Sequence, residues 1–156
     1  MNTALGQVTP PRGWTSVDVK IRGKSFRFVD THLEAFSAAV RNPQAAELLA
    51  GPAATDLPTV VVGDFNSGPG LDLGAYGTLL AGGFSDAWQG GPSSCCHKND
   101  LHDANAPLTK RIDLVFTRGG FETVAADLLG EQLGDRTPSG LWPSDHAGVV
   151  ATLRLL

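Results

Sequence analysis

Polar side chains that can do chemistry recur at the ends of apolar runs in this sequence. They are Asp30, His32 and Glu34 in FRFVDTHLE, Asp64 and Asn66 in VVVGDFN, Arg111 and Asp113 in RIDLVF, and Asp145 and His146 directly before GVVATLRL. Side chains two residues apart on a strand point to the same face of a sheet. The pattern therefore predicts a cluster of carboxylates, an amide and imidazoles at one rim of a sheet.

The residue types in this cluster suit metal-assisted hydrolysis of a phosphate ester. Carboxylate and amide oxygens are the ligands that Mg²⁺ and Mn²⁺ prefer, whereas a cluster of soft cysteine ligands would favour zinc. An Asp beside a metal can orient or deprotonate water. A His held by a second carboxylate can stay charged and stabilise the negative charge that develops during hydrolysis.

These residues are expected on β-strands, and the alternation of apolar and polar residues predicts where the strands lie. Apolar and polar residues alternate on both sides of RGK in the range 15–31, which is typical of a β-hairpin. The run TVVVG at 59–63 is apolar on both faces, as in a central strand that is covered on both sides. Further strands are predicted at 111–116, at the start of 121–129 and at 148–155.

Two helices and one long loop complete the predicted order. A helix is expected to begin with Asn42 as its N-cap and Pro43 in its first position, and to end at Gly51. The segment before Asn42 is expected to form at most a separate helical turn. AYGTLLAGG at 75–83 indicates a short helix ended by glycine. Residues 85–110 show no period and are predicted to be a long surface loop, which is often functional.

The bulk composition indicates one globular domain. The chain has 156 residues, is 42% hydrophobic and 18% charged, and has a formal net charge of −4. We expect a loosely ordered segment at 1–13 and a single domain at 14–156. Since there is no long basic run, general electrostatic binding of nucleic acids is not expected. No apolar run is long enough to span a membrane, and no signal pattern is seen, so a cytoplasmic protein is expected.

The two cysteines, Cys95 and Cys96, are adjacent. Adjacent cysteines are poor partners for a disulfide bond, because the two Cα atoms of a bridge usually lie about 4.4–6.8 Å apart. The sequence therefore predicts no disulfide framework. A zinc site formed by Cys95, Cys96, His97 and His102 is an alternative, although their spacing matches no standard zinc motif.

Each polar motif also has a purely structural interpretation. GDFN at 63–66 could be a tight turn, since Gly, Asp and Asn are turn residues. Asp145 and His146 could cap or turn the chain before the last strand, and RID could form an exposed salt bridge at a strand start. His32 could be a hydrogen-bonded structural histidine. The occurrence of the motifs together favours function over these interpretations.

The motifs resemble those of the endonuclease/exonuclease/phosphatase superfamily, which has a deoxyribonuclease-like fold. They are THLE at 31–34, GDFN at 63–66, RID at 111–113 and SDH at 144–146, in the order of the family. The stretch SCCHKNDLHDANAPLTKRIDLVF is also similar to a loop of bacterial members. The resemblance implies a hydrolase of phosphodiesters or phosphomonoesters.

The resemblance also implies roles for individual residues. Asp64 would activate water, and Asn66 would position the phosphate or Asp64. His146 would contact the scissile phosphate and would be oriented by Asp113, while His32 would bind a phosphate oxygen. No family role is carried over to Glu34 or Arg111.

The expected cofactor is Mg²⁺ or Mn²⁺, bound weakly if at all, with Asp64 and Asp145 as ligands. In the family, the N-terminal half supplies an Asn after the first strand and a metal-binding Glu on a later strand, and neither has a counterpart in this sequence. The resemblance therefore covers the C-terminal half of the family fold. The expected fold is α+β, half of a four-layer α/β/β/α sandwich with a mostly antiparallel sheet and helices on one face.

A lone half of such a sandwich would leave the inner face of its sheet bare. Soluble monomers rarely expose apolar patches above a few hundred Å². We therefore expect a homodimer through the inner sheet face, with a two-fold axis that makes the contact self-complementary. The expected partner at the active site is a small-molecule, lipid or nucleotide ester. The alternatives are a hydrolase of other esters at the same site, or a non-catalytic truncated half-domain that acts as an assembly module.

Overall fold

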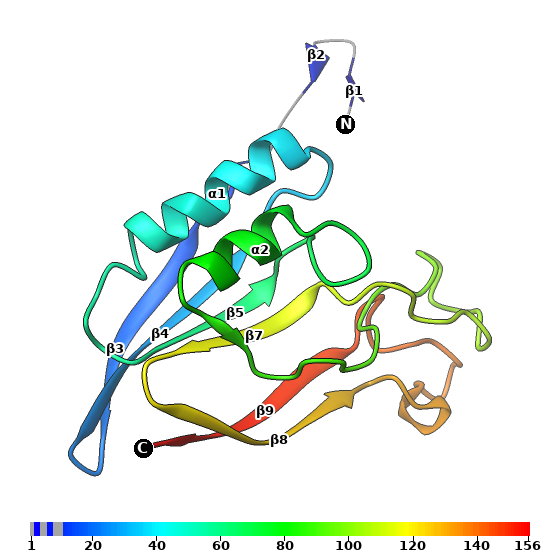
Figure 1. The fold of residues 1–156 in the computed structure, drawn as a ribbon. Coiled ribbons are helices and arrows are strands. Elements are labelled where there is room, and N and C mark those ends of the chain that lie inside the picture. Colours follow the sequence, from blue (N-terminus) through cyan, green and yellow to red (C-terminus); the bar gives the residue numbers. More distant parts are fainter. Residues whose placement is uncertain (1, 4–5, 8–10) are drawn as a thin grey trace.

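The computed structural model describes residues 2–3, 6–7 and 11–156 (Figure 1). Its strands are β1 (Asn2–Thr3), β2 (Gly6–Gln7), β3 (Trp14–Ile21), β4 (Lys24–His32), β5 (Thr59–Asp64), β6 (Ser85–Asp86), β7 (Asp113–Arg118), β8 (Phe121–Leu129) and β9 (Gly148–Leu155). The helices are α1 (Ala38–Ala50) and α2 (Gly74–Ala81), with a 3₁₀ turn at Leu133–Asp135. Residues 1, 4–5 and 8–10 of the segment 1–13, expected to be loosely ordered, lie outside the described residues, and that expectation stays a prediction.

The main sheet has five strands in the order β3-β4-β5-β7-β6. Strands β4 and β5 run parallel, and the other neighbouring pairs run antiparallel. Figure 1 shows both helices on one side of this sheet and the β8–β9 hairpin on the other. The predicted α+β class, with a mostly antiparallel sheet and helices on one face, is confirmed. No helix in the described part of the chain is long and apolar enough to cross a membrane.

The core lies between the sheet and the two helices. Val29, Val61 and Phe116 stand in one row of neighbouring strands and are fully buried. Leu48 of α1 and Leu79 of α2 are also buried in this core. This packed layer supports one face of the strands, and the other face carries the acids Asp30, Asp64 and Asp113.

Helix α1 begins five residues earlier than the sequence predicts. Its N-cap is Ser37, and Pro43 lies inside the helix rather than in its first position. The first turn is held by Arg41, a buried side chain that donates to the carbonyls of Glu34 and Ala35 and pairs with Asp72 at 2.6 Å. These tertiary contacts offset the hydrogen bond that Pro43 cannot donate, so the boundary expected at Asn42 is wrong.

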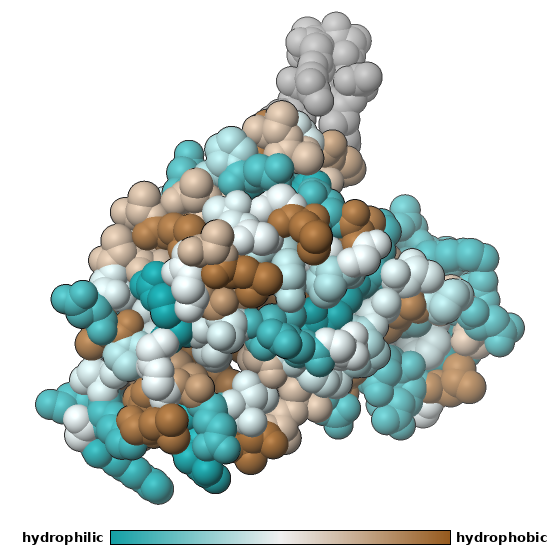
Figure 2. Space-filling view, viewed as in Figure 1, coloured by the Kyte–Doolittle hydropathy of each residue, from teal (hydrophilic) through white to brown (hydrophobic). Residues whose placement is uncertain are grey.

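The inner face of the sheet is partly covered by the β8–β9 hairpin. Val60 and Val115 point to this face and are buried, and Phe26 meets Phe121 of β8 edge-on with ring centroids 5.8 Å apart. Towards the β3–β4 turn the cover ends in a groove of about 620 Å³ lined mainly by apolar residues. Figure 2 shows apolar side chains gathered there, between the tip of the β3–β4 hairpin and the C-terminal end of β9. The inner face is therefore partly covered, not bare as expected for a lone half of the sandwich.

A buried ion pair ties the start of the long loop to its end. Arg111 donates two parallel hydrogen bonds to Asp86, at 2.7 and 2.8 Å, and the Asp86 side chain is fully buried. Burial alone would raise the pKa of Asp86, but the hydrogen bonds from Arg111 and the backbone of Trp88 hold it below its usual value. The exposed salt bridge considered for RID is thus a buried structural one.

Removing one member of this pair should be costly. We expect Arg111→Met to lower the free energy of unfolding by about 3–5 kcal/mol, because the Asp86 charge would remain buried without its partner. Arg154→Met is the matched control, since it breaks an exposed pair with Glu122 and should cost at most about 1 kcal/mol. Urea unfolding of both variants measures the difference. Equal, small losses would show that the buried pair does not stabilise the loop.

Candidate active site

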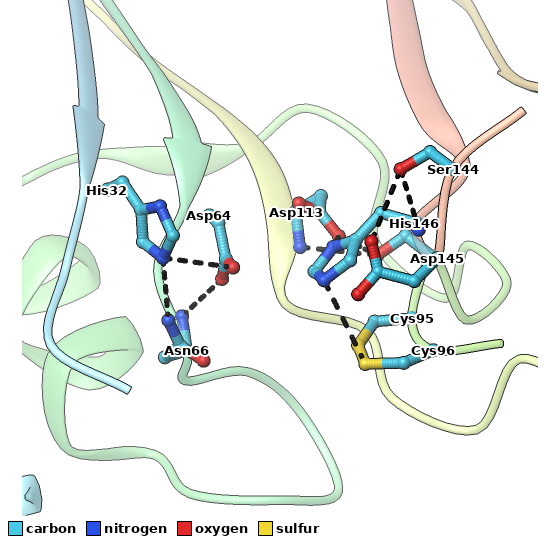
Figure 3. The surroundings of a disulfide bond; sticks show 10 residues. His32, Asp64, Asn66, Cys95, Cys96, Asp113, Ser144, Asp145 and His146 are labelled. Carbon is cyan, nitrogen blue, oxygen red and sulfur yellow. Dashed lines mark hydrogen bonds and ion pairs between the residues drawn. A yellow bond between two sulfur atoms is a disulfide. The ribbon is translucent and has the colours of Figure 1, made fainter. Parts of the chain in front are cut away.

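Three candidate residues stand in one row across the main sheet. The register pairs His32 of β4 with Asp64 of β5, and Asp64 with Asp113 of β7. Because β4 and β5 run parallel and β7 runs antiparallel to them, the C-terminal ends of two strands and the N-terminal start of the third share one edge. Nε2 of His32 lies 3.4 Å from Oδ2 of Asp64 (Figure 3).

The GDFN turn positions its residues by backbone constraint. Gly63 has φ +141°, and a Cβ at this position would lie 1.8 Å from the carbonyl oxygen of Thr31. Phe65 is fully buried and packs against Phe116 with ring centroids 5.0 Å apart. Asn66 adopts φ +47°, a left-handed conformation that Asn tolerates better than most residues.

The amide of Asn66 ties two strand ends together. Its Nδ2 donates to the carbonyl of Leu33 at 3.1 Å and lies 3.3 Å from Nε2 of His32. Its backbone N–H donates to Oδ1 of Asp64 at 2.8 Å. The turn interpretation of GDFN is therefore correct as geometry, and the same turn orients Asp64 at the sheet edge.

His146 is held by Asp113 across the sheet edge. Nδ1 of His146 lies 2.8 Å from Oδ2 of Asp113, which also accepts a 2.6 Å hydrogen bond from the hydroxyl of Ser94. With Nδ1–H donating to a carboxylate, Nε2 is the ring nitrogen left for another partner. Ser94 is fully buried and was not found from the sequence, because no local pattern marks a serine that contacts a residue 19 positions away.

Asp64, Asp113 and His146 form a compact group in which one ligand atom from each lies within 4.8 Å of the others. Burial raises the pKa of Asp64 above its usual value, and the nearby charge of Asp113 adds to this rise. The backbone N–H of Asn66 and the imidazoles of His32 and His146 oppose it. A carboxylate with a raised pKa is a better proton acceptor near neutral pH than an ordinary Asp.

The same edge borders a cavity of about 430 Å³ on the inner face. Asp30, Asp64 and Asp113 line it together with apolar residues of β4, β5, β7 and β9. Acids at the rim and apolar walls below them provide a site that can hold a polar group beside a hydrophobic one.

Other candidate residues lie apart from this group. Asp145 is exposed and belongs to neither metal-type cluster among the described residues, so its expected metal role stays a prediction. Glu34 is buried, and its Oε1 accepts from the backbone of Phe36. His97 is buried and stacks on Trp142 at 4.1 Å, and His102 is exposed. In the described part of the chain, His97 and His102 therefore do not form one metal-type cluster with the cysteines.

Cys95 and Cys96 form a disulfide bond across a cis peptide bond, with Cα atoms 3.0 Å apart. The expectation that these neighbours would not be bridged is wrong, because it assumed the usual separation of Cα atoms. Sγ of Cys96 lies 3.9 Å from Nε2 of His146 (Figure 3). The cysteine pair thus lies beside His146 of the site.

The carboxylates fit a hard divalent cation only in part. Asp64 and Asp113 offer oxygen ligands, and a cation between them would relieve their mutual repulsion. Mg²⁺ commonly takes one or two carboxylates and completes its shell with water and substrate oxygens. The residues present can therefore hold Mg²⁺ or Mn²⁺, with fewer protein ligands than a closed site.

Known proteins share this fold and sequence pattern. The family model described as Endonuclease/Exonuclease/phosphatase family matches residues 5–146. No curated protein sequence matches the chain closely enough to count as a relative.

Solved structures with the same fold cover almost the whole chain. An endonuclease/exonuclease/phosphatase from Bacteroides vulgatus is 24% identical over 93% of this chain, with a TM-score of 0.72. D. rerio TDP2, complexed with single-strand DNA product, is 19% identical over 92% at a TM-score of 0.71. A mannosyl-6-phosphatase from Bacteroides thetaiotaomicron is 20% identical over 97% at 0.68. This chain spans only 56%, 62% and 60% of their respective lengths.

The raised pKa of Asp64 predicts a stability change with pH. In the folded state Asp64 binds its proton more tightly than in the unfolded state, so its contribution to stability falls as pH rises from about 3.9 through its folded pKa. The Asp64→Asn variant does not lose stability in this way. We expect the free energy of unfolding of Asp64→Asn minus that of the unaltered chain to increase over this window.

Urea unfolding in chelator at several pH values measures this difference. Asp18→Asn is the control with the opposite sign. The hydrogen bond from Arg27 lowers the pKa of Asp18, so the difference for Asp18→Asn should fall as pH rises, and this change should lie below about pH 3.9. A difference for Asp64→Asn that follows the same direction as Asp18→Asn would contradict the proposed environment of Asp64.

Proposed function

This chain belongs to the endonuclease/exonuclease/phosphatase family, and from that premise we propose that it is a phosphate-ester hydrolase centred on Asp64 and His146. The observation that carries the proposal is the register row of His32, Asp64 and Asp113, with His146 bound to Asp113 at the same edge. A general base and an oriented imidazole within 4.8 Å of each other are the groups that ester hydrolysis needs.

In the proposed reaction, Asp64 accepts a proton from the attacking water. Its raised pKa and its position at the mouth of the 430 Å³ cavity support this role. Nε2 of His146 donates a hydrogen bond to a phosphate oxygen as negative charge develops, while Asp113 holds the ring by Nδ1. Asn66 keeps Asp64 and His32 in place, and His32, which is half exposed, contacts a second phosphate oxygen.

The proposed cofactor is Mg²⁺ or Mn²⁺. When bound at Asp64 and Asp113, such a cation would neutralise charge on the phosphate group. Asp145, on the exposed turn before β9, is proposed as a further ligand. We expect weak binding, because few carboxylates are available. The substrate class is a phosphodiester or phosphomonoester with an apolar portion, since the cavity below the acids has apolar walls.

The second candidate is a non-catalytic module for assembly. The groove of about 620 Å³ beside the β3–β4 turn favours it, since Ile21, Phe28 and Leu155 line an apolar surface that a partner could cover. We propose that a second copy of this chain covers it. The strands β8 and β9 form a two-stranded sheet, whose outer edges could pair with strands of another chain. A two-fold axis would make such a contact self-complementary. Assembly through this groove is also compatible with the hydrolase, with two sites near one shared rim.

Substitution of the central residues should abolish catalysis. We expect Asp64→Ala and His146→Ala each to lower the rate of hydrolysis by about 10²–10⁴-fold, the usual contribution of general acid–base groups. The assay uses generic phosphodiester, phosphomonoester and carboxylester substrates with Mg²⁺, Mn²⁺ or chelator. His102→Ala is the matched control, because His102 is an exposed histidine outside the site. Full turnover in both folded site variants would place the activity elsewhere.

The groove should control assembly. We expect light scattering after size exclusion to give twice the chain mass, and Ile21→Glu to reduce it to one chain mass by placing a charge in the groove. Leu71→Glu is the control, since Leu71 is exposed to a similar degree, 54% against 57% for Ile21, but lies outside the groove. A compact, cooperatively folded monomer of the unaltered chain at micromolar concentration would contradict the homodimer.

A further inference from the structure

The two cysteines and His146 form a second cluster of potential metal ligands beside the reaction centre. Both sulfur atoms and one ring nitrogen of His146 lie within 4.8 Å of one another. Cys95 is fully buried, and Cys96 and His146 are half-buried, so the cluster is partly shielded from solvent and still accessible to a cation. The zinc site considered from the sequence combined these cysteines with His97 and His102, whereas the structure places His146 beside them.

The backbone holds this cluster together independently of the disulfide bond. Cys95 forms β-bridges with both Lys110 and His146. On the His146 side, the N–H of Ala147 donates to the backbone carbonyl of Ser94, and the N–H of His97 donates to the backbone carbonyl of Asp145, both at 2.8 Å. These contacts keep the cysteine segment beside His146 when the sulfur–sulfur bond is broken.

The surroundings of His146 resemble those of a metal-bound histidine. Nδ1 is bound to the carboxylate of Asp113, and that carboxylate is in turn bound by the hydroxyl of Ser94. A histidine that ligates a metal almost always donates its other ring N–H to a carboxylate, carbonyl or water. This support leaves Nε2 directed at the sulfur of Cys96 (Figure 3).

We propose that the reduced cysteine pair and Nε2 of His146 bind a thiophilic divalent cation of the zinc class. Reduction adds two electrons and two protons and converts the disulfide into two thiols. When a phosphine is the reductant, it becomes a phosphine oxide, and water supplies the oxygen and both protons. Binding of the cation to two thiolates then releases two protons.

The distance between Cys96 and His146 fits such a site. Zinc–sulfur and zinc–nitrogen bonds of about 2.3 and 2.0–2.1 Å place tetrahedral ligand atoms roughly 3.5–3.8 Å apart. The observed 3.9 Å between Sγ of Cys96 and Nε2 of His146 is close to this range. Two sulfurs and one nitrogen leave a fourth position for water, as in open zinc sites.

Cation binding at this site takes His146 away from the phosphate ester. His146 belongs both to this cluster and to the group with Asp64 and Asp113, and its Nε2 can serve one partner at a time. The disulfide form is thus the one competent for hydrolysis, and the reduced, metal-bound form is blocked. This consequence for activity rests on the proposed function, whereas the metal site does not.

Cobalt titration tests the metal site without any activity assay. Co²⁺ bound to thiolates in a tetrahedral site gives intense charge-transfer absorption. We expect one equivalent of Co²⁺ to produce it in phosphine-reduced protein and not in the disulfide form, and Zn²⁺ to displace it. Because this comparison uses the unaltered chain, it decides the question even if a variant fails to fold.

Variants identify the ligands. In reduced protein we expect Cys96→Ser and His146→Ala to weaken Co²⁺ binding by more than the roughly 10–100-fold that loss of a supporting group costs. His102→Ala, the exposed histidine of the same loop, should bind as the unaltered chain does. Equal binding in the oxidised and reduced forms, or an unchanged affinity in His146→Ala or Cys96→Ser, would overturn the proposal.

The hydrolase assay separates the two proposals. If the oxidised protein hydrolyses a phosphate ester, Zn²⁺ should inhibit the reduced form alone, and inhibition of both forms to the same extent would overturn the blocking role. If no form is active, the proposed function fails while the cobalt result still decides the metal site.

Discussion

The register between β4, β5 and β7 is the constraint on which the rest of the site depends. It places His32, Asp64 and Asp113 in one row, although they are 32 and 49 residues apart along the chain. A slip of one residue would turn every side chain of a strand to the opposite face. The buried row of Val29, Val61 and Phe116 opposes such a slip, because it would move these side chains out of the helix-covered core.

The two faces of the sheet have different tasks. The helix-covered face supplies a packed core, and the inner face carries acids above apolar walls. This arrangement explains why burial is the main cause of the raised pKa of Asp64: its carboxylate stands at the edge of a surface that excludes water. Gly63, directly before Asp64, must remain a glycine for this arrangement, since any side chain there would collide with β4.

Much of this architecture was predictable from the sequence, because period-two alternation and strand-end polar residues are local signals. Strand β9 and the strand ending at Asp64 were predicted within a residue of their bounds. The start of α1 was missed because contacts of Arg41 with distant residues outweigh the local preference of Pro43. Ser94 and the closeness of Cys96 to His146 were missed for a related reason: both depend on pairing between segments far apart in sequence, which no local pattern records.

The buried pair of Asp86 and Arg111 has an evolutionary consequence. It closes the long loop at its base, and the bridges of Cys95 fasten it again at Lys110 and His146. Between these anchors, residues 98–107 are mostly exposed or half-exposed. Within this interval, the carbonyls of Leu101 and Asp103 accept hydrogen bonds from Trp142, so changes at these two positions would reach the segment before His146. Elsewhere in the interval the sequence can vary without shifting Asp113 or His146, because the anchors on either side hold both residues.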